Sequence, residues 1–62
     1  MCASNVYVVR GENEDLLMKD VAEIRVEGEK LLLTGILGET KEIKGRIVRL
    51  DLEGHAIYIE EQ

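Results

Sequence analysis

The sequence predicts an all-β protein folded as a small antiparallel β-barrel of five to seven short strands. Its apolar residues are mostly Val, Ile and Leu, and in several segments they alternate with charged residues, as in half-buried strands. Turns that contain glycine recur at a spacing of roughly ten residues, a pattern typical of small barrels and sandwiches. No segment shows a convincing helical periodicity. The 62 residues suffice for a single domain, 1–62.

The first half of the chain contains three expected strands. Residues 5–10, NVYVVR, form a β-branched run, and the glycine and asparagine in GENED at 11–15 favour a turn. We interpret residues 15–19 as a short strand and Asp20 as a bend. In residues 21–27, apolar and charged side chains alternate, which predicts a strand with one face exposed to water.

The next strands begin after Gly28, which can take the left-handed position of a tight hairpin. Residues 30–37 are mostly apolar, so we expect a strand that is covered on both faces. Gly38 provides the following turn. Residues 40–44 form a short polar strand in which Ile43 points inward.

Gly45 allows a bulge or a sharp bend before the last two strands. Residues 46–52 alternate in polarity, and Gly54 is the residue expected to permit the turn that follows. Residues 56–60, AIYIE, form the final strand. A curled barrel of the SH3-like kind fits this length best. The alternation in the strand at 46–52 places on one face Val48, Leu50 and Leu52.

Composition and charge argue against nucleic-acid binding and against insertion into a membrane. The net charge is −5, with two tyrosines and no Trp or Phe, so the chain lacks the basic surface and stacking aromatics of a typical nucleic-acid binder. No apolar run approaches the ~18 residues of a membrane span, and no signal peptide is recognisable. We therefore expect a cytoplasmic protein, in which a lone thiol stays reduced, and no nucleic-acid or membrane partner.

The small size of the domain predicts a need for extra stabilisation. A domain of about 60 residues buries only roughly 60% of the surface that its unfolded chain exposes. The single cysteine cannot form a disulfide within the chain. Oligomerisation, metal binding or both are therefore expected.

The residue types do not favour catalysis. The sequence contains no Ser/His/Asp elbow, GxGxxG motif, P-loop or CxxC motif. Cys2 and His55 have the types of a nucleophile and a base, but a flexible terminus preorganises a nucleophile poorly. We interpret His55 as a turn residue rather than a metal ligand, and the 13 acidic residues as a solvated surface. The chain is predicted not to be an enzyme.

The only cysteine directly follows Met1. The small side chain of Cys2 allows an aminopeptidase to remove Met1, after which one residue carries both a thiol and a free α-amine. These groups close a five-membered chelate ring on a metal, and the amide nitrogen of Ala3 is the next donor. Sulfur with nitrogen suits Ni(II) or Cu(II), whereas zinc prefers more thiolates or imidazoles. Cys2 and Ala3, in a flexible N-terminal segment at 1–4, are the candidate metal-binding residues.

A homodimer would complete such a site. One terminus offers only two or three donors, whereas two termini across a twofold axis offer two sulfurs and two nitrogens. A single ion shared between two chains would also provide the oligomerisation that the small size calls for.

Three parts of the sequence carry a resemblance to a known family. The MC start, DVAEIRVEG at 20–28 and GRIVRLDLEGHAIYIEE at 45–61 resemble the CooT family of small nickel-binding proteins. The resemblance covers nearly the whole chain. It implies a homodimer of β-barrels that binds one Ni(II) per dimer, with Cys2 as the key ligand. It further implies a metallochaperone or nickel store for a nickel enzyme such as carbon monoxide dehydrogenase, with that enzyme or its maturation factors as partners.

The alternative is a small RNA-binding or protein-interaction barrel in which Cys2 is incidental. Tyr7 and Tyr58 are its only candidates for stacking on bases. Acidic residues interleave with the basic ones along the sequence, which favours a solvated face over a basic patch. The basic residues that such a patch would use are Arg10, Lys41, Lys44, Arg46 and Arg49.

Overall fold

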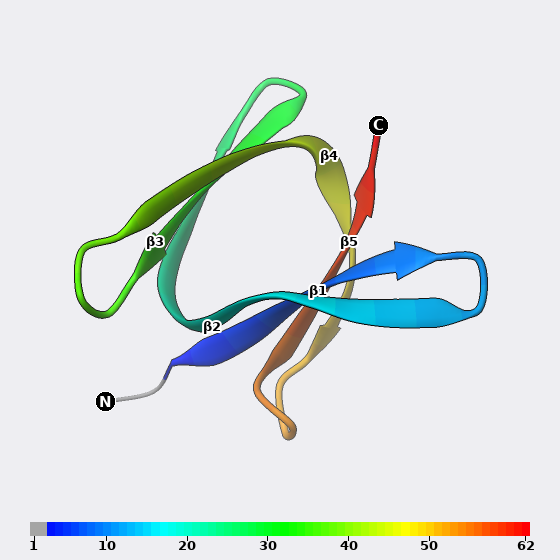
Figure 1. Cartoon of the computed structure of the whole chain (residues 1–62), viewed down its shortest axis with the longest axis horizontal. Helices are drawn as coiled ribbons and strands as arrows, with labels where there is room; N and C mark the ends of the chain where they lie inside the picture. The colour runs from blue at the N-terminus through cyan, green and yellow to red at the C-terminus, as the bar shows by residue number, and fades with distance from the viewer. Residues whose placement is uncertain (1–2) are drawn as a thin grey trace.

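The computed structural model describes residues 3–62, which form a closed barrel of five strands (Figure 1). Consecutive strands pair antiparallel, and the first and last strands pair with each other in parallel. This parallel closure follows from the odd number of strands, because in an up-and-down order the first and fifth run the same way. The predicted all-β barrel is confirmed. The strands are β1 (Ser4–Arg10), β2 (Asn13–Glu27), β3 (Lys30–Gly35), β4 (Thr40–Asp51) and β5 (Ala56–Glu61).

The long strand β2 corrects the sequence prediction of two separate strands at 15–19 and 21–27. The two segments form one strand that bends where Asp20 adopts a left-handed backbone with φ of 54°. The bend lets β2 pair with β1 before this point and with β3 after it. Val21 stands at the change of partner, because it pairs with both Ser4 and Gly35.

The strands predicted at 40–44 and 46–52 likewise form one continuous strand, β4. Gly45 was expected to allow a bulge or bend between two strands, yet β4 runs through it without interruption. Lys44 still pairs with β3, whereas Gly45 pairs with Glu61 of β5. A Cβ atom at Gly45 would overlap the carbonyl oxygen of Glu60, so the glycine allows a close backbone approach at the barrel corner.

The apolar residues near the end of β4 are largely exposed. The register shifts between Ile47 and Arg49, and a shift of one residue changes which side chains share a face. Ile47 packs against the core, while Val48, Leu50 and Leu52 are 41%, 54% and 80% exposed. These three residues therefore lie largely outside the core.

Two turns also differ from expectation. The strand expected at 30–37 ends at Gly35, whose N–H donates to the carbonyl oxygen of Glu39 at 2.8 Å. Its side chains alternate in burial, so it is not covered on both faces. In the turn before β5, His55 rather than Gly54 takes the left-handed conformation, with φ of 53°. Gly54 instead allows a close approach of Asp51, whose Oδ1 accepts the Gly54 N–H at 2.9 Å.

The core fills the inside of the barrel and draws on every strand. Its side chains are β-branched or Leu residues that alternate with outward-facing residues along each strand, which is the packing pattern of a small barrel. Partly buried side chains of β2, β4 and β5 pack around it. The buried cluster consists of Val6, Val8, Val21, Leu31, Leu33, Ile43 and Ile59.

Candidate metal centre

The two predicted metal-binding residues lie at the very start of the chain. Cys2 lies outside the residues that the structure describes, together with the first half of the predicted flexible segment 1–4. Ala3 is half-buried and immediately precedes β1. Ser4 already belongs to β1 and pairs with Val21 of β2. The chain therefore joins the barrel two residues after Cys2.

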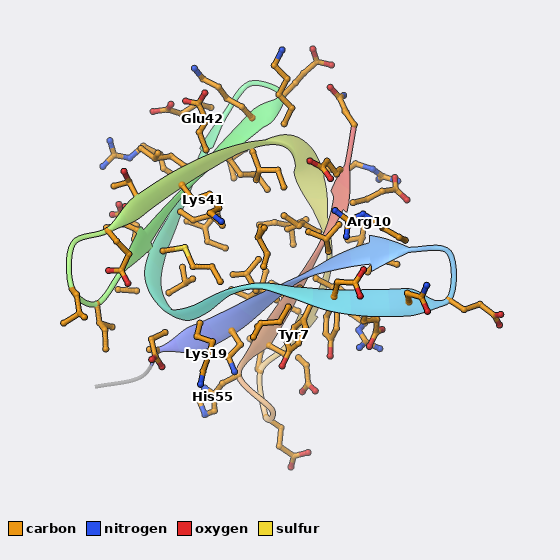
Figure 2. The ribbon with its side chains drawn as sticks, in the orientation of Figure 1. Tyr7, Arg10, Lys19, Lys41, Glu42 and His55 are labelled. Atoms are coloured by element: carbon orange, nitrogen blue, oxygen red, sulfur yellow. The ribbon has the colours of Figure 1, made fainter. Side chains whose placement is uncertain are left out.

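The first residues of β1 are fixed from two sides at Asn5. The Asn5 N–H donates to the carbonyl oxygen of His55 at 3.0 Å, and this bond ties β1 to the turn before β5. On the other side, the Asp20 N–H donates to Asn5 Oδ1 at 3.2 Å. We call Asn5, Asp20 and His55 the anchor. Figure 2 shows the His55 side chain at the end of the barrel where β1 begins.

The anchor does not follow from the sequence pattern. That pattern predicts the bend at Asp20, but it assigns the turn before the last strand to Gly54 rather than to His55. The available signal was residue type, because Asn, Asp and His adopt left-handed backbone more readily than other non-glycine residues. Which of these residues meet depends on the pairing of β1 with β2 and β5, and local sequence does not report that pairing.

The donor chemistry at the N-terminus fits a nickel ion. After the predicted removal of Met1, a thiolate and a terminal amine on Cys2, with the Ala3 amide nitrogen next in line, would form the sulfur and nitrogen set that Ni(II) accepts. Within residues 3–62, no three His, Cys, Asp or Glu side chains are grouped so that they could hold a metal ion. Cys2 and Ala3 stay the predicted metal-binding residues.

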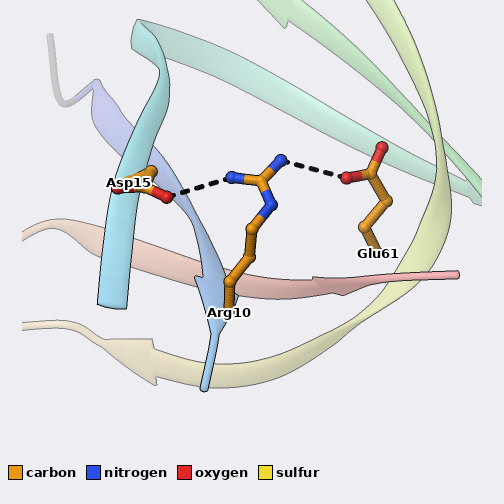
Figure 3. A network of polar contacts seen from close by, with 3 residues as sticks. All are labelled: Arg10, Asp15 and Glu61. Atoms are coloured by element: carbon orange, nitrogen blue, oxygen red, sulfur yellow. Dashed lines mark hydrogen bonds and ion pairs between the residues drawn. The ribbon is translucent and has the colours of Figure 1, made fainter. Parts of the chain in front are cut away.

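The three arginines suggested for an RNA-binding patch contact carboxylates, whereas no ion pair is found for the two lysines among the described residues. Arg10 contacts Asp15 at 3.0 Å and Glu61 at 3.1 Å, which ties the β1–β2 hairpin to the end of β5 (Figure 3). Arg46 contacts Glu60 at 3.1 Å. The paired carboxylates oppose the approach of phosphate groups to these arginines.

The two tyrosines are also engaged with protein groups. The rings of Tyr7 and Tyr58 stack with centroids 5.3 Å apart, and Arg49 lies 3.9 Å from the Tyr58 centroid. Arg49 in turn contacts Glu14 at 3.6 Å. Because stacking on bases needs accessible ring faces, this arrangement works against the RNA-binding alternative.

The comparison with protein families decides the assignment. The sequence model of the family described as "CO dehydrogenase accessory protein CooT" matches residues 1–60. The chain belongs to the CooT family. The predicted family resemblance is therefore confirmed, and the match includes Cys2, Ala3 and all three anchor residues.

Relatives and a solved structure agree with CooT membership. A protein assigned provisionally as CooT from Carboxydothermus hydrogenoformans has a crystal structure that matches with a TM-score of 0.91 and 36% identity, over 98% of both chains. An uncharacterized protein of Methanothermobacter thermautotrophicus is 47% identical over 97% of this chain and 89% of its own. An uncharacterized protein of Methanocaldococcus jannaschii is 35% identical over 97% of this chain and 98% of its own.

CooT membership sets the general role. The chain is an accessory protein linked to CO dehydrogenase maturation and not a catalyst, in agreement with the predicted absence of enzyme activity. Residues 3–62 contain no helix that is long and apolar enough to cross a membrane.

Proposed function

We propose that this chain binds Ni(II) through Cys2 at the interface of a homodimer and serves as a metallochaperone or nickel store for a nickel enzyme such as carbon monoxide dehydrogenase. The observation that carries the proposal is CooT membership over residues 1–60, combined with a thiol at position 2. The net charge of −5 also favours the approach of cations. The reduced thiol that the proposal requires places the protein in the cytoplasm.

A homodimer is supported by apolar surface close to the anchor. Leu50 and Leu52 are 54% and 80% exposed, and Leu52 belongs to the same turn as His55. This turn and the start of β1 both lie at the lower edge of Figure 1. Pairing of two copies through this surface would cover the leucines and bring both N-termini to one axis, where four sulfur and nitrogen donors share one ion.

Titration of untagged protein with nickel tests the proposal. We expect one Ni(II) per dimer by native mass spectrometry, and thiolate-to-nickel charge-transfer bands in the absorption spectrum. Cys2→Ser should lose both signals while keeping its fold and dimeric mass. Equal nickel affinity in the wild type and in Cys2→Ser would overturn the proposal.

The proposed ligands predict a pH dependence of nickel binding. Protons compete with the metal for the Cys2 thiolate and the terminal amine, so affinity should fall as the pH is lowered. Calorimetric titrations from mildly acidic to mildly alkaline pH measure this trend. A flat profile would argue against ligation by Cys2.

A further inference from the structure

We draw no further inference here: the strongest candidate, the surface patch that the exposed side chains of Ile36 and Leu37 form in the turn between β3 and β4, is apolar and unpartnered, and nothing in the part of the chain that the structure describes shows what covers it.

Discussion

Similar apolar residues are buried in the interior of the barrel but exposed at the end where β1 begins. Inside, Val6, Leu33 and Ile59 are fully buried by neighbouring strands. At the anchor end, Leu50 and Leu52 project largely into solvent beside a turn with a left-handed histidine. Burial of apolar area stabilises a fold, whereas exposed apolar groups and unfavourable backbone cost stability and are common at interaction sites. The comparison indicates that the interior maintains the fold, whereas the anchor end offers the apolar surface that we propose for dimerisation.

The largest expected effect is the loss of stability caused by a substitution in the core. Leu33→Ala removes a side chain with 0% exposure and should lower the free energy of unfolding by about 2–5 kcal/mol, through lost burial and the cavity left behind. Urea denaturation followed by circular dichroism measures the change. As a control, Leu37→Ala, at a position that is 87% exposed, should stay within about 0.5 kcal/mol of the wild type. Equal losses in the two variants would contradict the assigned core.

The second largest expected effect is stabilisation of the protein by nickel, which distinguishes metal binding at the N-terminus from folding of the barrel. Free Ni(II) at about 100 times its dissociation constant should stabilise the wild type by roughly 2.7 kcal/mol, because the metal binds the folded state. Thermal unfolding with and without nickel measures the shift. Cys2→Ser should unfold at the wild-type temperature without nickel and gain nothing when nickel is added. A nickel-induced shift of the same size in Cys2→Ser would place the metal elsewhere.

The third expected effect is on dimerisation, and it distinguishes Leu52 from another exposed leucine, Leu37. Leu52→Glu adds a charge to the surface proposed for the dimer and should weaken dimerisation by at least about tenfold, equivalent to roughly 1.4 kcal/mol. Sedimentation velocity over a dilution series measures the dimer constant. Leu37→Glu is the matched control, because Leu37 is equally exposed but lies in the turn between β3 and β4. A dimer that tolerates Leu52→Glu and is broken by Leu37→Glu would move the interface to that turn.

The smallest effect concerns the ion pairs of Arg10. Both of its contacts, to Asp15 and Glu61, involve side chains that are about half exposed. Exposed pairs contribute about 0.2–1 kcal/mol, so Arg10→Gln should destabilise the chain by no more than this amount. Denaturation at low and high salt checks it, since salt screens exposed charges. A loss that persists undiminished at high salt would show that Arg10 contributes chiefly through packing.

The fold was predictable where local pattern was sufficient. The left-handed conformation of Gly28, the turn at Gly38 and the bend at Asp20 agree with the prediction. The continuity of β2 and β4 was missed, because a strand that changes partners looks in sequence like two short strands. The register shift in β4 was missed because it depends on pairing with β5.

For the candidate site the sequence predicts donor chemistry, which stays a prediction because Cys2 lies outside the described residues. A thiol at position 2 and the amide nitrogen of Ala3 indicate sulfur and nitrogen ligation from residue type alone. The anchor could not be predicted, because Asn5, Asp20 and His55 belong to three separate segments that meet only when β1 pairs on both of its edges. The interpretation of His55 as a turn residue is confirmed for its backbone.

Alternation and glycine act locally, so the sequence alone predicts most strand segments and most turns. The chemistry of Cys2 is local in the same way, and its proposed role as a metal donor stays a prediction. The pairing of distant segments decides that β2 and β4 are each shared between two partners, that Leu50 and Leu52 stay exposed, and that the His55 carbonyl oxygen meets the N–H of Asn5. These features follow from closing the barrel, which sets the register between segments that are distant in sequence.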